Sequence, residues 1–566
     1  MQAQLREVGL FLFTAWGLGL LWLDSLRAHR SEPRERGLAA LCIGGAVIAP
    51  LTYVLALLER ALPGSLRVGG ALLALAGIGR LALEGVRCAR IRAQRPGAVM
   101  AVAAAIALLL ILRLAFLKNL LLPPYTDSVI HYQIVRGMLL PELADEIRIS
   151  IPGLVQQYYH LGFHSVAAWL SSVTGQPVEG AIPLLGQLYL VLAALSASVL
   201  TMALTDSRDA ALWAALLAAL AFRMPAFAAN WGKYPAISAI ATLPAVMACV
   251  FWLRGSLRGH SMWISVLVLI GAVTLLHTRA LVPAAVMLVA WWLAGRLVPA
   301  EGLGVERALR FSVLYVVSLA PLIYVLREFY GAVAPAVVVI GLLPFAFLAF
   351  PRVAIACYVF TFGLWAITLL PSMLGDASLV VLNQQFVEIL LYLPLAVLGG
   401  AGLGGLISRL KISASQRAAR LGATAIASLL LATAWSSLRP DPCCNYVEDG
   451  DLRAIQWIGQ NAAEDSLVLT SSFSEDGQVF GTDAGIWIQP LTGRSTNRIR
   501  FDTDWSEGIE VASLCTRREP GIYIYVGGAP WSFRSGALAK QPWAELAFQA
   551  GATAVYRVAT CEAFRN

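Results

Sequence analysis

The amino-acid sequence predicts an α-helical, polytopic membrane protein of about 14 transmembrane helices that ends in a small α/β domain. Of its 566 residues, 58% are hydrophobic and 13% charged, against roughly 25% charged in an ordinary soluble protein. Apolar windows recur from the N-terminus to about residue 437, each long enough to cross a hydrocarbon core of roughly 30 Å. The composition then changes abruptly after Arg439, where strand-like runs begin.

The apolar windows define the expected transmembrane helices. They are predicted at residues 8–26, 38–58, 68–87, 98–121, 183–204, 208–223, 234–254, 261–279, 281–297, 309–326, 332–350, 353–371, 386–407 and 420–437. The first window lacks a basic flank and a small-residue cleavage site, so we expect it to be retained as a helix rather than removed as a signal peptide. The first three windows make up an N-terminal membrane extension, residues 1–97.

The positions of the arginines predict the orientation. They gather in the loops at residues 27–36, 87–95 and 409–420, which the helix count places on one side of the membrane. By the positive-inside rule that side is the cytoplasm of an inner or plasma membrane, and the tail, residues 438–566, is extracytoplasmic. The net charge of +8 therefore reports orientation, and we do not expect a nucleic-acid partner.

One outer loop, at about residues 123–182, is much longer than a minimal turn, and loops of this length carry function more often than packing. Within it, Leu161–Val173 is apolar but too short to span comfortably, so it is predicted to be an interfacial or re-entrant helix. In the tail, Ser466–Thr470 and Gly521–Val526 read as strands and Gly450–Gln460 as a helix.

The tail contains four cysteines, Cys443, Cys444, Cys515 and Cys561. In an oxidising compartment they predict one or two disulfides, although we do not expect the adjacent Cys443 and Cys444 to bond each other. The tail has no CxxC pair and no nearby histidine, so a zinc site is not expected.

Candidate catalytic residues open the long loop. Pro123 and Pro124 should end the preceding helix, and Thr126 can cap a new one, which would place Asp127 and His131 four residues apart on one face. An acid and an imidazole would then point together. The same spacing also fits a carboxylate that only stabilises a helix N-terminus and a histidine that only packs at the interface.

A second acidic pair, Asp145 and Glu146, lies further along the same loop. Two adjacent carboxylates can supply a catalytic base, or they can simply be a solvated pair on the surface.

Other polar and aromatic residues are expected at the outer membrane surface. They are Tyr159 and His164 in the long loop, Trp231 and Lys233 after the sixth span, and His277 and Arg279 at the end of the eighth. Arg279 lies between two apolar runs, where it could bind a lipid phosphate through paired N–H donors. Alternatively, the aromatic residues are interfacial anchors and Arg279 extends to the lipid headgroups.

Several motifs together resemble integral membrane glycosyltransferases of the GT-C superfamily, in the group related to protein mannosyltransferases and oligosaccharyltransferases. The motifs, in chain order, are PPYTDSVIHYQI, YYHLGFHSVAAWLSSVTG, NWGKYP, LLHTRAL, QQFVEILLYLPLAVLGGAGLGGL, DLRAIQWIGQN and GTDAGIWIQPLTGR. The resemblance covers most of the chain from residue 98 onward. It implies a GT-C-like catalytic core at residues 98–437.

In this superfamily a carboxylate in the first large outer loop is the catalytic base and the donor is a polyprenyl-phosphate sugar. Asp127 matches the position of that base. Family members commonly have two acidic residues close together, whereas Ser128 follows Asp127 here, so Asp145 or Glu146 remains open as the second carboxylate or as the base itself. The residues predicted to bind substrate are Arg279, His277, Lys233, Trp231, Tyr159, His164 and Arg494.

The sequence thus predicts an inverting transfer of sugar from a polyprenyl-phosphate carrier to a hydroxyl of a glycan, lipid or protein acceptor. No metal or other cofactor is expected, since arginine can neutralise the phosphate, although a divalent cation could do so too. A transporter or lipid flippase is the main alternative, but it would favour mid-membrane charges and repeated halves. A third hypothesis makes the tail a recognition module on a catalytically inactive membrane base.

Overall fold

The computed structural model describes the chain in two compact units. The described residues exclude residue 1 and residues 26–32, 95, 142–149, 257–259, 300–302, 320–328, 331–332, 375–380, 414–421, 423–424, 427–429, 431–437, 476–477, 507, 516–520 and 560–566. The first unit comprises Met1–Lys118, Pro152–Ala229 and Lys233–Arg439, and the second comprises Asn119–Ile151, Asn230–Gly232 and Pro440–Asn566.

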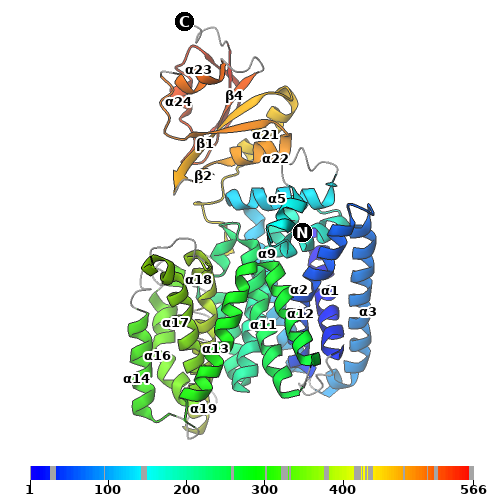
Figure 1. Ribbon diagram of the computed structural model, residues 1–566, viewed down its shortest axis with the longest axis vertical. Helices are drawn as coiled ribbons and strands as arrows, with labels where there is room; N and C mark the ends of the chain where they lie inside the picture. The colour runs from blue at the N-terminus through cyan, green and yellow to red at the C-terminus, as the bar shows by residue number, and fades with distance from the viewer. Residues whose placement is uncertain are drawn as a thin grey trace. The chain divides into compact units, whose positions relative to one another are not determined.

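The first unit is a bundle of long helices that lie side by side (Figure 1). In chain order these helices are α1 (Gln2–Ser25), α2 (Pro33–Leu58), α3 (Ser65–Gln94), α4 (Pro96–Leu114), α8 (Gly162–Thr174), α9 (Val178–Thr205), α10 (Arg208–Leu216), α11 (Tyr234–Ser256), α12 (His260–Leu276), α13 (Leu281–Leu297), α14 (Val305–Ser318), α16 (Val333–Ala349), α17 (Pro351–Leu374), α18 (Gln384–Leu390) and α19 (Tyr392–Ser413). Short helical turns adjoin them: η1 (Ala115–Asn119), η3 (Leu217–Ala221), η4 (Ala226–Ala229) and η5 (Thr278–Ala280).

Among the described residues, 8 helices are long and apolar enough to cross a membrane, and two shorter apolar helices, Trp263–Leu276 and Val338–Ala349, accompany them. The predicted class of polytopic helical membrane protein agrees with this bundle. The predicted count of about 14 spans stays a prediction, because several windows, including 420–437, fall largely outside the described residues.

Small residues let the N-terminal helices approach closely. A Cβ built on Gly17 of α1 would lie 1.8 Å from the carbonyl oxygen of Gly77 in α3, and one built on Gly44 of α2 would lie 1.6 Å from that of Ala15. Only glycine fits at such crossings, the usual way in which helices pack within a membrane. The Tyr189 hydroxyl of α9 also donates to the Gly45 carbonyl at 2.9 Å, so the N-terminal helices are part of the same bundle.

Helix α8 occupies the segment predicted as interfacial or re-entrant. Its residues Gly162–Ser171 are all buried. The Trp169 Nε1 donates to the Gly70 carbonyl of α3 at 3.1 Å, and the Ser165 hydroxyl lies 3.0 Å from that of Thr52 in α2. An interfacial helix would leave one face exposed, so this burial argues against the interfacial alternative.

The second unit contains a six-stranded mixed sheet. Its strands are β1 (Leu467–Glu475), β2 (Gln478–Gly481), β3 (Ser495–Arg500), β4 (Ile522–Val526), β5 (Ala544–Ala550) and β6 (Thr553–Val558). The order is β2-β1-β4-β6-β5, with β3 also paired to β1. Strand β1 is parallel to β3 and β4, whereas β2, β5 and β6 pair antiparallel with their neighbours.

Helices complete the second unit: α5 (Tyr125–Leu139), α21 (Asp449–Asn461), α22 (Ile488–Thr492), α23 (Ile509–Cys515) and α24 (Ser535–Leu538), with the turn η10 (Ala484–Trp487) (Figure 1). The short helix α7 (Ile151–Gln156) follows in the chain. Every residue of β4 is buried, and its side chains join an apolar core that includes Trp505, Phe533 and Trp543. The predicted α/β character of the tail is confirmed, with β1, β4 and α21 at the predicted segments.

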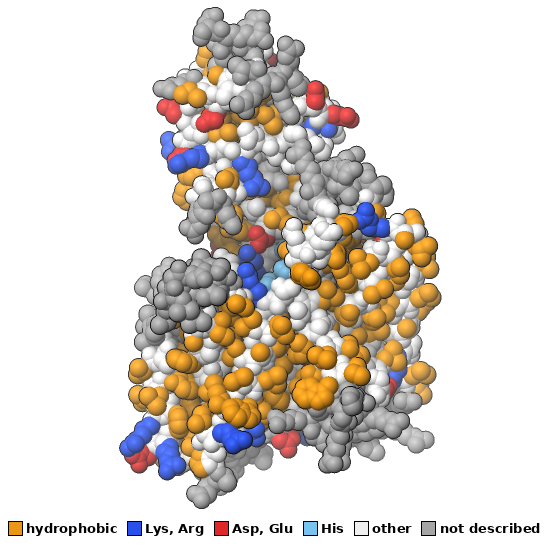
Figure 2. All heavy atoms as spheres, viewed as in Figure 1, with side chains coloured by type: hydrophobic (Ala, Val, Ile, Leu, Met, Phe, Trp, Pro, Cys, Tyr) orange, Lys and Arg blue, Asp and Glu red, His pale blue; other side chains and the backbone are white. Residues whose placement is uncertain are grey.

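The two units differ in their surfaces. On the face drawn in Figure 2 the helical unit is covered mostly by hydrophobic side chains, with charged residues near the helix ends, while the sheet unit carries charged side chains over its surface. Exposed apolar side chains such as Leu72, Leu75, Leu83 and Leu267 are more than 60% exposed in the helical unit. A contiguous apolar surface of this kind suits a lipid solvent rather than water.

Candidate functional site

Helix α5 begins directly after the two prolines of the long loop. Pro124 is its N-cap residue, with an extended backbone and no side-chain cap, and Tyr125 starts the helix with a φ of 66°. The predicted Thr126 cap is therefore wrong. Thr126 lies two residues beyond the N-cap, within the first turn, and its hydroxyl donates instead to the Gly481 carbonyl at 3.4 Å.

Asp127 lies in the first turn of α5 and is half-buried. Its backbone neighbour Ser128 is fully buried, and the Ser128 hydroxyl donates to the Pro124 carbonyl. A carboxylate in a first turn interacts favourably with the positive end of the helix dipole, which stabilises the helix.

The turn from the NWGKYP motif packs against this first turn. Gly232 has a φ of 64°, and a Cβ built on it would lie 2.7 Å from the Ser128 hydroxyl, 3.0 Å from the Ser128 nitrogen and 3.3 Å from the Asp127 Cβ. Both the backbone conformation and the close approach therefore require glycine. Two motifs about a hundred residues apart thus meet at Asp127.

His131 lies one turn further along α5 and is 5% exposed. Its Nε2 is 2.9 Å from the carbonyl oxygen of Gly232, so the imidazole joins the helix to the same turn. Asp127 and His131 therefore both face Gly232, as their spacing predicts. The Nε2 of His131 is thus engaged by the backbone of the Gly232 turn.

A third segment, residues 440–446, closes around the start of α5. The backbone nitrogen of Tyr125 donates to the Cys444 carbonyl at 3.0 Å, and the side chain of Asn230 accepts from the Asp441 nitrogen at 2.8 Å. The rings of Tyr125 and Tyr446 are 6.2 Å apart. The sequence-separated segments at residues 123–131, 230–232 and 440–446 thus form one cluster, which we call the α5 cluster.

The cysteine prediction requires a correction. Cys443 and Cys444 are bonded to each other in the α5 cluster, where Cys444 is 3% exposed. The expectation that adjacent cysteines would not pair rested on their unusual geometry, but the tertiary contacts of residues 440–446 hold this short ring in place. Cys515 is also disulfide-bonded, and Cys561 lies outside the described residues.

The second unit also contains two fully buried carboxylates, Asp451 and Asp483. Asp483 accepts from the Ser532 hydroxyl at 2.5 Å and from the Gly485 nitrogen at 2.9 Å. Asp451 accepts from the hydroxyls of Tyr525 at 2.6 Å and Thr553 at 2.7 Å. Burial, with a smaller contribution from the nearby charge of Asp451, raises the pKa of Asp483 to about 6, although its hydrogen bonds act in the opposite direction.

Neither carboxylate was among the residues predicted for the site, although both lie within the motifs that carry the resemblance. Asp483 follows strand β2 in GTDAGIW, and Asp451 opens DLRAIQW. The feature of the sequence that could have pointed to these carboxylates is the Gly527–Gly528 pair after β4, because glycines at the end of a strand often mark a close approach of the backbone. Cβ atoms there would lie 3.0 Å from the Asp483 Cβ and 3.1 Å from the Glu448 carboxylate, so the glycines let the sheet approach the acids closely.

The first unit holds a separate cluster of histidines and aromatic rings. The rings of Tyr159 and His160 stack at 4.3 Å, His160 and His277 are 4.1 Å apart, and Tyr159 and His164 are 5.9 Å apart. Phe386 adds a ring 5.0 Å from His277. We call this set the histidine cluster; it brings together residues of three different sequence motifs.

Arg279 is joined to the histidine cluster by a hydrogen bond from its backbone nitrogen. Its nitrogen donates to Nδ1 of His277 at 3.3 Å, in the turn η5 that precedes α13, and its side chain is half-buried. Lys233 and Trp231 are also half-buried and flank Gly232 in the chain. The Lys233 nitrogen donates to the Ala228 carbonyl at 3.1 Å, at the start of α11.

The remaining predicted residues have other positions. The Arg494 guanidinium donates to the carbonyls of Ala462, Thr492 and Gly459 at 2.9 to 3.1 Å, which gives it a structural role at the C-terminus of α21. Asp145 and Glu146 lie outside the described residues. Within the described part of the chain, no group of three or more His, Cys, Asp or Glu residues could hold a metal ion.

Comparison with known proteins gives a family and one distant likeness. A model described as "Family of unknown function (DUF6541)" matches residues 12–327. No curated protein matches the chain.

Among solved structures, the chain is similar to the cryo-EM structure of arabinofuranosyltransferase AftD from Mycobacteria, with 14% sequence identity and a TM-score of 0.36. The match covers 81% of this chain and 40% of that one, so the chain spans about two fifths of the length of the structure it matches. A likeness of this size decides neither the fold nor the activity.

Proposed function

The chain belongs to the DUF6541 family, whose model matches residues 12–327 of its 566, and from the chemistry of its own residues we propose that it is a membrane-bound glycosyltransferase of the GT-C type. It would move a sugar from a polyprenyl-phosphate carrier to an acceptor hydroxyl at the extracytoplasmic membrane surface. The observation that carries the proposal is the α5 cluster, in which three distant segments meet around the first turn that bears Asp127.

Three features of the α5 cluster support Asp127 as the base. The carboxylate lies in the first turn of α5, directly after the proline break. It is half-buried, so it can reach a substrate hydroxyl. Its turn is fixed on one side by Gly232 and on the other by the Cys444 carbonyl, which is the rigidity that a positioned general base needs.

The proposed reaction is a single displacement. Asp127 takes the proton of the acceptor hydroxyl while the hydroxyl oxygen attacks the anomeric carbon of the donor. The bond from that carbon to the carrier phosphate breaks, the phosphate leaves with the bonding electrons, and the anomeric configuration inverts. In the helical unit, Arg279 is proposed separately as a residue that can bind a carrier phosphate through the paired N–H donors of its guanidinium.

The test is turnover of polyprenyl-phosphate sugars by the purified protein, followed as carrier release. Asp127→Asn should preserve thermal stability and lower turnover by roughly 10²-fold or more, the usual contribution of a positioned general base. Asp465→Asn, an exposed acid in the same unit, is the matched control and should have wild-type turnover.

Other outcomes separate the alternatives. If Asp127→Asn retains turnover while Asp145→Asn or Glu146→Gln abolishes it, the base is the second acidic pair. If none of the three changes affects turnover, the glycosyltransferase proposal is wrong. A flippase would move the carrier between leaflets without releasing sugar from it.

A further inference from the structure

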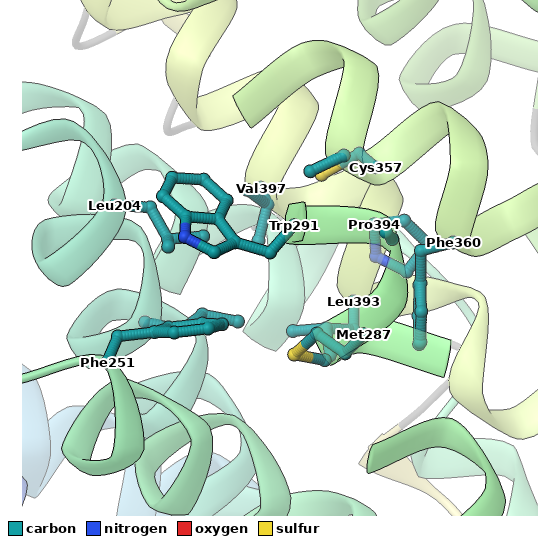
Figure 3. Close-up of a pocket in the computed structure, with 12 residues that line it drawn as sticks. Leu204, Phe251, Met287, Trp291, Cys357, Phe360, Leu393, Pro394 and Val397 are labelled. Atoms are coloured by element: carbon teal, nitrogen blue, oxygen red, sulfur yellow. The ribbon is translucent and has the colours of Figure 1, made fainter. Parts of the chain in front are cut away.

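The apolar cavity between helices of the first unit is too small for a substrate. It lies between α9, α11, α13, α17 and α19, and its volume is about 30 Å³, roughly a tenth of that of a small ligand pocket. Apolar side chains line it, among them Phe251, Trp291 and Phe360 (Figure 3). A surface with the features of a binding site lies instead on the sheet of the second unit.

Aromatic side chains continue one face of the sheet beyond the point where its apolar core ends. Leu469 of β1 and Ile499 of β3 belong to that core. Alternate residues of a strand lie on the same face of a sheet, so Phe473 and Phe501 lie on the core face as well. The Phe501 nitrogen donates to the Ser472 carbonyl at 2.9 Å, which extends the pairing of β3 with β1 to this position.

Two pairs of rings make up this surface. Phe473 pairs with Phe480 of β2 across the β1–β2 hairpin, and their rings stack with centres 5.3 Å apart. The Trp531 indole meets the Phe501 ring at 90°, with centres also 5.3 Å apart. The three phenylalanines are half-buried, whereas Trp531 is 59% exposed. We call these four residues the aromatic surface.

The same unit contains a buried pair with matching geometry. Trp505 and Phe533 meet at 90° with ring centres 5.0 Å apart, and they are 2% and 3% exposed. Full burial of a large apolar side chain contributes about 1.5–3 kcal/mol to stability. The unit thus buries one pair of this kind in its core and leaves a second, Trp531 with Phe501, in contact with solvent. Exposed groups of large apolar side chains mark interaction sites.

Hydrogen bonds fix the backbone on both sides of the exposed indole. The Thr482 hydroxyl donates to the Trp531 carbonyl at 2.7 Å. The next residue, Ser532, donates through its hydroxyl to the buried Asp483 at 2.5 Å and accepts from the Gly527 nitrogen at 2.7 Å. The indole is therefore presented on a rigid turn, and little conformational freedom is lost when a ligand binds to it.

Charged side chains of both signs adjoin the aromatic surface in the chain. Arg500 and Asp502 flank Phe501, are exposed and form an ion pair at 2.8 Å. Asp504 and Arg534, which follow Asp502 and the tryptophan turn, are exposed as well. The two cations balance the two anions, so these groups do not favour a strongly charged partner such as anionic lipid or nucleic acid. Carboxylates and guanidinium groups do form hydrogen bonds with hydroxyls.

We propose that the aromatic surface binds a neutral oligosaccharide, the acceptor of the proposed transfer. A sugar ring presents a face of C–H groups that is apolar and slightly positive, so it stacks on the negative face of an aromatic ring. Its hydroxyls bind the carboxylates and guanidinium groups alongside. Four rings are far fewer than the roughly 20–30 residues a side of a stable protein interface, which favours a glycan over a protein. The identity of the oligosaccharide as acceptor rests on the proposed function, but its binding does not.

The test is titration calorimetry of the full-length protein in nanodiscs, which avoid the sugar headgroups of common detergents. The probes are neutral hexasaccharides of glucose, mannose, galactose and arabinose, and the wild type should bind at least one of them. Trp531→Ala should weaken that binding about tenfold, the effect of losing one stacked ring, whereas Trp531→Phe, which keeps a ring, should lose less. Ile509→Ala, which removes a side chain that is 62% exposed on α23, should bind like the wild type.

The two proposals fail in different ways. If the proposed reaction is wrong, polyprenyl-phosphate sugars are not turned over, but hexasaccharide binding still depends on Trp531. Three results would overturn the inference: no binding of any hexasaccharide by the wild type, equal affinities of wild type and Trp531→Ala, or equal losses in Trp531→Ala and Ile509→Ala. Brominated lipids that quench the fluorescence lost in Trp531→Phe would also overturn it, since the indole would then be a membrane anchor.

Discussion

At the scale of single residues, Gly232 has the strongest constraint at the proposed base. Its φ of 64° and the 2.7 Å approach of the Ser128 hydroxyl leave no space for a side chain. Gly493 also has a positive φ, 74°, but nothing lies within 4 Å of a Cβ built there. Substitutions at the two glycines can therefore be compared. Both would introduce backbone strain, but only a substitution of Gly232 would also disturb the contact with α5.

We expect Gly232→Ala and Gly493→Ala to lose about 1 kcal/mol of stability each through the positive φ. Only Gly232→Ala should also lower turnover, because the new methyl group must displace the turn that carries Asp127. Thermal unfolding and carrier release measure the two effects. Normal turnover in Gly232→Ala would show that the contact does not position the base.

The ionisation of Asp483 should make the stability of the folded protein depend on pH. Its pKa is raised from 3.8 to about 6 by burial, so the folded protein binds the proton more tightly than the unfolded chain does. The stability from this group is therefore fully present below about pH 4 and is lost as pH rises through 6. The loss is on the order of 3 kcal/mol.

Asp483→Asn mimics the protonated carboxyl, so we expect it to be more stable than the wild type at pH 7.5 and little different at pH 4. Thermal unfolding of both proteins over this range measures the difference. Asp465→Asn, an exposed acid before β1, should show no such dependence on pH. A constant difference between Asp483→Asn and wild type would mean that the Asp483 proton is not linked to folding.

At the scale of elements, both ends of helix α21 are capped by side chains. Glu448 and Asp451 form a capping box at its start, where the Glu448 nitrogen donates to Asp451 at 2.9 Å. Arg494 binds the carbonyls at its end. Because Asp451 also accepts from Tyr525 and Thr553, the helix start is joined directly to strands β4 and β6.

Arg494 could cap helix α21 or bind substrate, and a mutation distinguishes these two roles. If it caps α21, Arg494→Ala should lower the unfolding free energy by roughly 1–3 kcal/mol, since three carbonyls lose their donor, and the KM for the donor should not change. Arg500→Ala, which removes only an exposed ion pair with Asp502, should cost much less. A raised KM with unchanged stability would instead favour the substrate-binding role predicted from the sequence.

At the scale of the whole molecule, the proposed function depends on membrane orientation. Reporter fusions at residues 30, 92 and 415 should report the cytoplasm, and fusions after residue 440 the opposite side, because arginine-rich loops are retained inside. A cytoplasmic C-terminal domain would contradict the proposed function, which requires the carrier's outer leaflet. It would also place the Cys443–Cys444 bond in a reducing compartment, where disulfides rarely persist.

The sequence by itself determined the class of this protein, because hydrophobicity, arginine placement and strand or helix period are properties of local segments. Those signals located the helices of the bundle, the strands β1 and β4, and the helix α21, and they singled out Asp127 and His131 on one face of a helix.

Only the tertiary structure decided what surrounds Asp127. The approach of Gly232 to α5, the hydrogen bond from Tyr125 to the Cys444 carbonyl, the burial of Asp451 and Asp483, and the carbonyls bound by Arg494 all depend on segments tens to hundreds of residues apart. Such contacts leave no period in the sequence, because which distant groups meet depends on how whole elements pack and not on the preferences of any one segment.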